Sequence, residues 1–168
     1  MDVAEFVEIS TGVPNVNLAG YSLVFWNGNG DISYLALSLN AATDPQGLLL
    51  VGNTAVIPAP AITFMNNTLQ NGADAVAVHQ GLPALFPNGT VINATGLIDA
   101  VVYDTADADD TGLLMTLLGL GAVQVDEGAN PASESQSIQR CANGRLNGLR
   151  FGTVGPPTPA APSAFVCP

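Results

Sequence analysis

The feature that most constrains the fold is a pair of apolar runs joined by a short turn in the first quarter of the chain. The runs LAGYSLVFW (18–26) and ISYLALSL (32–39) have the length and the apolar, aromatic composition of β-strands. The connecting NGNGD (27–31) contains Asn-Gly pairs, which accept the positive φ angles of tight turns. The segment therefore predicts an antiparallel hairpin with alternating side chains, in which Tyr34 and Leu35 lie on opposite faces.

Similar runs, each bounded by turn residues, recur along the chain. Strands are predicted at 4–10, 48–53, within 71–81, at 97–104 and near the end of 133–141, with a proline-led edge strand at 58–65. The run at 48–53 is apolar on both faces, which indicates a central strand. Only LLMTLLG (113–119) has a helical pattern, with Asp110 or Thr111 as the expected N-cap and Gly119 near its end.

These strands, together with 18 glycines and 12 prolines, indicate an all-β protein. The predicted architecture is a β-sandwich with one short helical insertion, and a small barrel is the alternative. A length of 168 residues suits one domain, which we expect to span 1–155. The proline-rich tail, 156–168, is expected to be extended rather than packed.

The two cysteines, Cys141 and Cys167, both lie in the last third of the chain. An even pair in a turn-rich, acidic chain predicts one disulfide, which would tie the tail back and would require an oxidising compartment. Two buried free thiols are the alternative. The cysteine and histidine spacings of zinc sites are absent from the sequence.

The charge of the chain is one-sided. It has 14 acidic residues, 3 arginines, no lysine and a formal net charge of -11. Such a surface repels polyanions, which argues against nucleic-acid binding and against docking on an anionic membrane. No run reaches the ~18 apolar residues of a membrane-spanning helix. Because only 10% of the residues are charged, we expect glycans or neighbouring subunits to cover the surface. Solubility is the preferred interpretation of the acidity, and an acidic binding surface is the alternative.

The segment NGADAVAVHQG (71–81) contains the only histidine, His79. In a strand, Asp74 shares one face with the valines, and His79 shares the other face with the alanines. We expect the valines to enter the core and Asp74 to accept hydrogen bonds from the turn at Asn71–Gly72. The alanine face leaves room for close packing by another sheet element, a glycan or a second subunit.

His79 has no partner in sequence that would make it catalytic. No nucleophile elbow, metal-binding histidine pair or phosphate-binding loop occurs in the chain. A structural histidine is therefore the preferred interpretation, and a general base is the alternative. We accordingly expect no enzyme activity, no catalytic residue and no cofactor.

An acidic stretch follows the strand predicted at 97–104. Its carboxylates belong to Asp104, Asp107, Asp109 and Asp110. Such a cluster is a weak calcium candidate, because calcium prefers oxygen ligands, and a solvated turn is the alternative. An EF-hand loop starting at Asp107 fails, because Leu118 stands where a glutamate is required.

Three sequons predict N-glycosylation, at Asn66, Asn88 and Asn93. About two such triplets are expected by chance in a chain this rich in asparagine and threonine, so their predicted positions matter more than their number. Asn88 and Asn93 share one predicted surface loop, and Asn66 lies near a strand end. Together with the predicted disulfide, the sequons indicate an extracellular or cell-surface protein.

Several motifs occur in an order that resembles the lamin-tail domain family. These motifs are EFVEI, LAGYSLVFWN, LLLVGN, NGADAVAVHQG, LIDAVVYD, SIQRC and TPAAPS. The resemblance is to the extracellular, non-nuclear branch of the family and covers about residues 5 to 163. It implies an immunoglobulin-like β-sandwich used for binding, anchoring or structure, with no catalytic residues. The acidic and helical stretch at 104–119 departs from the family pattern and looks like an insertion, and the cysteine pair is a second departure.

The three arginines, Arg140, Arg145 and Arg150, lie in one short span. Arg140 is expected to pair with acidic residues on a neighbouring strand. A sharper interpretation is a basic patch that docks on the acidic face of another copy, giving a head-to-tail contact that can propagate. We therefore expect a secreted structural glycoprotein, a self-assembling fibre or surface-layer subunit. The alternative is a carbohydrate- or protein-binding module of a larger secreted protein, and a hydrolase is a third class that no motif supports.

Overall fold

The computed structural model describes residues 4–126, 137–140 and 157–162, and the backbone of 151–155. Both cysteines and two of the arginines lie outside the described residues, whereas the strand predicted near the end of 133–141 is present at Ser137–Arg140. The elements, in chain order, are β1 (Phe6–Ser10), β2 (Tyr21–Asn27), β3 (Ile32–Ser38), β4 (Leu48–Gly52), β5 (Ile62–Thr63), β6 (Asp74–Gln80), η1 (Pro83–Leu85), β7 (Leu97–Asp104), α1 (Thr111–Leu113), η2 (Leu114–Leu118), β8 (Val125–Asp126), β9 (Ser137–Arg140) and β10 (Phe151–Gly155).

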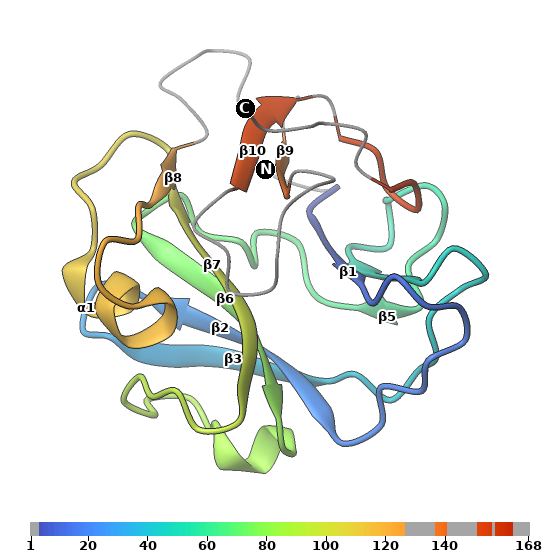
Figure 1. Cartoon of the computed structure of the whole chain (residues 1–168), viewed down its shortest axis with the longest axis horizontal. Helices are drawn as coiled ribbons and strands as arrows, with labels where there is room; N and C mark the ends of the chain where they lie inside the picture. Colours follow the sequence, from blue (N-terminus) through green and yellow to red (C-terminus); the bar gives the residue numbers. More distant parts are fainter. Residues whose placement is uncertain (1–3, 127–136, 141–150, 156, 163–168) are drawn as a thin grey trace.

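A five-stranded sheet and a three-stranded sheet form the sandwich (Figure 1). The larger sheet has the order β3-β2-β6-β7-β8, and the smaller sheet has the order β1-β4-β5. Pairing is antiparallel except for β8 against β7 and β5 against β4, and β9 and β10 form a separate antiparallel pair. The prediction of an all-β sandwich with one short helical insertion is confirmed, and neither sheet closes into a barrel.

The predicted hairpin is present as β2 and β3, but its register contains a bulge. Phe25 pairs with Leu35 and Trp26 pairs with Ser33, so Tyr34 is the extra residue between the two pairs. As a result, Tyr34 and Leu35 pack against the same core cluster instead of lying on opposite faces. The prediction of strict alternation is therefore wrong at this position, because one inserted residue shifts the two-residue period of the strand.

The core between the two sheets is built on β2 and β4. Phe25 lies against Phe64 and Tyr34, with ring centroids 5.7 and 5.8 Å apart, in the same cluster as Leu49 and Val51. Every residue of β4 is buried and β4 has a neighbour on each side, which confirms the central strand predicted at 48–53. The edge strand predicted from 58–65 is also confirmed, as the two-residue β5.

The other face of the larger sheet packs against the helical insertion (Figure 1). Ala75 and Ala77 of β6 lie in one buried cluster with Trp26 and with Leu113 and Leu117 of the insertion. Small side chains allow the helical segment to approach the sheet closely. Within the described residues, the alanine face is thus filled by the helical insertion of the same chain, which was not among the expected occupants: a sheet element, a glycan or a second subunit.

The helical insertion begins at a capping aspartate. Asp110 has an extended backbone, and its Oδ1 accepts a hydrogen bond of 2.7 Å from the Leu113 amide, so the predicted N-cap is Asp110 rather than Thr111. One α-helical turn then widens into a π-helical turn, in which the Gly119 amide donates to the Leu114 carbonyl at 2.9 Å. The segment ends at Leu118, immediately before Gly119, as predicted.

The described part of the tail, 157–162, is folded back rather than extended. The Ala161 amide donates to the Thr158 carbonyl at 3.0 Å, and Ala160 has a left-handed backbone with φ 59°. The Ala160 amide donates to Oε2 of Glu8 in β1 at 2.6 Å. The prediction of an extended tail is therefore wrong at this turn, which brings a backbone donor to a β1 carboxylate, although residues 157, 158, 161 and 162 are exposed.

Candidate functional site

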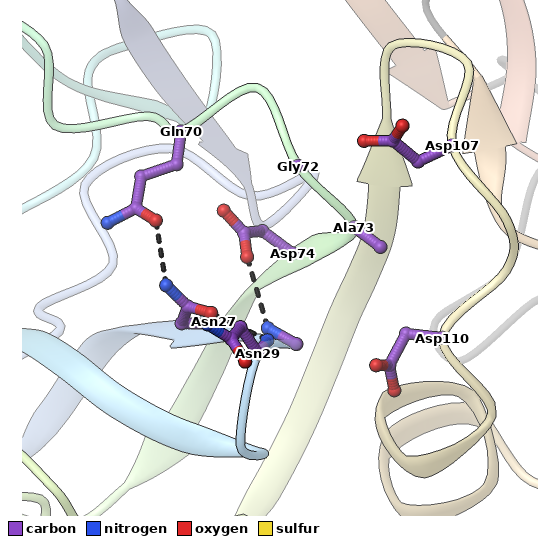
Figure 2. A pocket seen from close by; sticks show the side chains of 9 residues that line it. Asn27, Asn29, Gln70, Gly72, Ala73, Asp74, Asp107 and Asp110 are labelled. Carbon is purple, nitrogen blue, oxygen red and sulfur yellow. Dashed lines mark hydrogen bonds between the residues drawn. The ribbon is translucent and has the colours of Figure 1, made fainter.

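A polar depression of about 470 Å³ lies where three turns meet (Figure 2). The turns are the β2–β3 hairpin turn, the turn before β6 and the acidic loop between β7 and α1. The lining residues are Asn27, Gly28, Asn29, Gln70, Gly72, Ala73, Asp74, Asp107 and Asp110. We refer to this set as the acidic depression.

The hairpin turn is held by its own side chains and packs closely on its neighbours. Oδ1 of Asn27 accepts from the Asn29 amide at 2.6 Å, and Nδ2 of Asn27 donates to Oε1 of Gln70 at 2.8 Å. Gly28 lies directly against the Ala73 carbonyl, and a Cβ at this position would come within 2.8 Å of Oδ2 of Asp110. Only glycine lets the hairpin turn and the acidic loop approach so closely.

Asp74 is the most unusual group of the acidic depression. Its side chain is 2% exposed, Oδ1 accepts from the Gly28 amide at 3.1 Å, and Oδ2 has no partner among the described residues. Burial raises the pKa of Asp74 to about 6, the Gly28 hydrogen bond lowers it, and the charge of Asp110 raises it further. The prediction that the Asn71–Gly72 turn supplies the donor is wrong, because the hairpin turn packs against the start of β6 and reaches Asp74 first.

Two further carboxylates line the acidic depression from the opposite side. Figure 2 shows Asp107 and Asp110 on the acidic loop, on the far side of Ala73 from Asn27 and Gln70. Asp107 is exposed, whereas Asp110 is half-buried. Next to them, burial and then the charge of Asp110 raise the pKa of Asp31, so these acids repel one another.

The four acids of the weak calcium candidate do not form one site. Asp107 and Asp110 line the acidic depression, Asp109 is exposed outside it, and Asp104 is fully buried at the end of β7. Oδ2 of Asp104 accepts from Nε2 of Gln124 at 2.7 Å, and burial, followed by the neighbouring Asp126, raises the pKa of Asp104 to about 6. In the described ranges, no three acidic, histidine or cysteine side chains gather at metal-binding distances.

His79 is a core side chain. It is fully buried, with ring centroids 4.6 Å from Phe86 and 5.8 Å from Trp26. Nδ1 lies 2.9 Å from the Thr95 carbonyl, and burial lowers the pKa of the ring, an effect that this hydrogen bond opposes. The only histidine therefore contacts no solvent and cannot reach a substrate at the surface, which agrees with the structural interpretation.

The predicted glycosylation sites lie on turns and loops. Asn66 and Asn88 are exposed, and Asn93 is half-buried. Oδ1 of Asn93 accepts from the Thr95 amide at 3.1 Å, and Nδ2 donates to the Val91 carbonyl at 3.1 Å. The sequons at Asn66 and Asn88 thus present free amide groups more openly than the one at Asn93.

Arg140 behaves as predicted for a structural arginine. Its Nη2 donates to both carboxylate oxygens of Asp99 in β7, at 2.8 and 2.6 Å. Arg145 and Arg150 lie outside the described residues, and so do Cys141 and Cys167, so their predicted roles stay predictions. The charge of Arg140 is thus neutralised by Asp99 of the same chain, without a contact to a second copy.

Sequence patterns single out neither the acidic depression nor its amide side chains. Asn27, Asn29 and Gln70 belong to turns that are far apart in sequence, and no spacing rule connects them to Asp107. The one available signal is the position of Asp74 at the entrance of an otherwise apolar strand.

No protein-family model matches the chain, and searches among curated proteins and among solved structures found no match. No helix in the described part of the chain is long and apolar enough to cross a membrane.

Proposed function

We propose that the chain is a secreted, non-enzymatic structural glycoprotein domain that assembles with copies of itself into a fibre or a surface layer. The observation that carries this proposal is the placement of all three sequons on turns or loops. Asn66 and Asn88 are exposed, and Asn93 is half-buried in the loop before β7. Glycans at such positions would add solubility to a surface with few charges.

Two of the sequons share one turn geometry. The threonine hydroxyl donates to the carbonyl three residues earlier, at 2.7 Å for Thr68 and 2.6 Å for Thr90. The middle residue of each sequon has a left-handed backbone, with φ 57° at Asn67 and 86° at Gly89. A glycan on either asparagine would displace no packed side chain, which supports modification of the folded surface.

Exposed apolar side chains support assembly. Ile57, Met65 and Leu120 are 85%, 81% and 88% exposed, in a chain in which only 10% of the residues are charged. Exposed apolar groups that charge does not surround favour contact with other molecules. We expect neighbouring copies, together with glycans, to cover these side chains.

The non-enzymatic part of the proposal is supported by the position of His79. A general base must reach the proton that it removes, and the ring of His79 is enclosed by the rings of Trp26 and Phe86. Among the described residues, no serine, threonine or cysteine side chain is seen to form a hydrogen bond with the carboxylates of the acidic depression. A structural role is therefore favoured over hydrolysis.

An immunoglobulin-like fold of the lamin-tail type belongs to the same proposal, as does a disulfide between Cys141 and Cys167. The order of motifs from EFVEI to TPAAPS supports the first, and the even cysteine count supports the second. Intact mass before and after reduction and alkylation tests the disulfide. Alkylation of both cysteines without prior reduction would contradict it.

The experiment for the proposed function is secretion of the full chain from a eukaryotic cell. We expect intact mass to fall on treatment with peptide N-glycosidase, and electron microscopy to show filaments or layers. Asn66→Gln and Asn88→Gln should each remove one glycan, and Asn71→Gln, outside any sequon, is the matched control. An unmodified chain that is monomeric over a wide concentration range would refute the proposal.

A binding module of a larger secreted protein is the second candidate, and the acidic depression favours it. Carboxylates and amide side chains around a hollow of about 470 Å³ suit a small polar ligand. Screening the protein against carbohydrates and cationic peptides tests this candidate. Saturable carbohydrate binding by a protein that does not assemble would favour it over the structural role.

A further inference from the structure

The acidic depression concentrates negative charge that no described residue of its lining neutralises. Asp74, Asp107 and Asp110 line it, and none of the described lining residues is cationic. Asp74 is 2% exposed, and its Oδ2 has no partner in the described part of the chain. A buried carboxylate without a cationic partner is costly, so the site favours a positively charged occupant.

The dimensions of the depression favour an organic cation over a metal ion. Its volume of about 470 Å³ far exceeds that of one ion, and the described carboxylates form no group of three at metal-binding distances. The lining also includes the amide side chains of Asn27, Asn29 and Gln70. A guanidinium group suits this lining, because it presents five N–H donors in one plane and can bridge separated acceptors.

The composition of the chain identifies the source of such a group. Because the chain has no lysine and His79 is buried, the cationic side chains that a second copy can offer are arginines. Arg140 already donates to Asp99 at 2.6 Å, which leaves Arg145 and Arg150 as candidates. We propose that the acidic depression receives the guanidinium of Arg145 or Arg150 from a second copy of this chain. The donor and the acceptor are different residues. In a pair of copies, one copy therefore keeps an empty acidic depression and the other keeps an unused arginine, so the contact can propagate head to tail.

This inference rests on the proposed self-assembly and adds the contact that joins neighbouring copies. Asp107 is the most accessible carboxylate of the acidic depression, so we expect it to contact the incoming group directly. Asp74 contributes through the charge that it holds in a buried position. Loss of one charged hydrogen bond should weaken association about tenfold, and added salt should weaken it further.

The first test compares two neutralising variants of the acidic loop by sedimentation velocity. Asp107→Asn removes a lining carboxylate, and the control, Asp109→Asn, removes an exposed carboxylate of the same loop outside the depression. Both change the net charge by one unit. We expect about tenfold weaker association for Asp107→Asn and native association for Asp109→Asn. Equal association of the two variants would overturn the inference.

The second test mixes two variants that should each be unable to assemble. One carries Asp107→Asn with Asp110→Asn, since asparagine also serves as an N-cap, and the other carries Arg145→Gln with Arg150→Gln. The arginines of the first variant can enter the intact depression of the second. We therefore expect a mixture of the two to form dimers that do not grow. A mixture that stays monomeric would exclude a second copy as the source.

The third test probes the chemistry of the depression directly. Methylguanidinium should shift the NMR amide signals of Gly28 and Gly72, while tetramethylammonium, which has no N–H donor, should not. Native assembly that is insensitive to Asp107→Asn and to methylguanidinium would overturn this inference and leave the proposed function standing. A native chain that never assembles would refute the proposed function and, with it, the second-copy source.

Discussion

Replacing Asp74 with asparagine should stabilise the protein near neutral pH and lose that advantage in acid. Asp74 is 2% exposed, and burial raises its pKa from 3.8 to about 6. The folded protein holds the proton more tightly than the unfolded chain does, so ionisation of Asp74 destabilises the fold. The destabilisation is small below a pH of about 4 and grows as the pH rises through 6.

The size of the effect follows from the shift in pKa. A difference of about two units corresponds to about 3 kcal/mol once the carboxyl is fully ionised, of which about 0.5 kcal/mol is already present at pH 4. Asparagine keeps an oxygen for the Gly28 amide, but its N–H group replaces the unpartnered Oδ2 at a pH-independent cost of about 1 kcal/mol. We expect the variant to be about 2 kcal/mol more stable than the native protein at pH 7 and nearly equal to it at pH 4.

Urea unfolding followed by circular dichroism at several pH values between 4 and 7 measures the difference. Burial also raises the pKa of Asp31 and Asp104, but both groups are present in each protein, so their contributions largely cancel. Asp109→Asn is the matched control, because it removes one exposed carboxylate that lies outside the acidic depression. If the difference in free energy of unfolding between Asp74→Asn and the native protein stays constant from pH 4 to pH 7, the reasoning is refuted, whatever the sign of the difference.

Three further outcomes are expected. Gly28→Ala should lower the free energy of unfolding in the urea assay by about 3 kcal/mol or more, because a Cβ would overlap the backbone of the facing turn. At Gly72 an added Cβ meets open space, so the control Gly72→Ala should change this free energy by less than about 1 kcal/mol. Arg140→Gln should cost about 1 kcal/mol by thermal unfolding, and high salt should reduce the loss, because the half-buried contact with Asp99 is ionic. An NMR titration of His79 should give a pKa below 6.5, because burial disfavours the charged ring. The unfolded chain then binds the proton more tightly than the folded protein, so His79 should lower the free energy of unfolding as the pH drops below 6.5. A ring that titrates at 6.5 would contradict its burial.

Local patterns predicted the parts of this fold that depend on neighbouring residues. The Asn-Gly turn at 27–31 identified the hairpin, the apolar run at 48–53 identified the central strand, and Asp110 was recognisable as an N-cap from its place before an apolar helical run. Each of these features is decided by backbone preferences or by a period within one element. The ion pair of Arg140 was also expected, although its partner, Asp99, could not be named.

Features that depend on which turns meet in space could not be predicted. The bulge at Tyr34 reflects how β3 fits against both β2 and the loop at 89–92, where the Ser33 amide donates to the Thr90 carbonyl at 2.8 Å. The donor to Asp74 comes from Gly28, 46 residues earlier in the chain. The acidic depression has the same origin, because it forms only where three separate turns pack together.

The position of the single tryptophan gives the protein a built-in optical probe. Trp26 is fully buried, and its ring lies 5.8 Å from that of His79 and 6.1 Å from that of Phe86, measured between centroids. Its fluorescence should keep the short-wavelength emission of an apolar site while copies associate through their surfaces. Emission should move to longer wavelength only when the core opens to water. Fluorescence and light scattering recorded on one sample would thus separate assembly from unfolding without any attached dye.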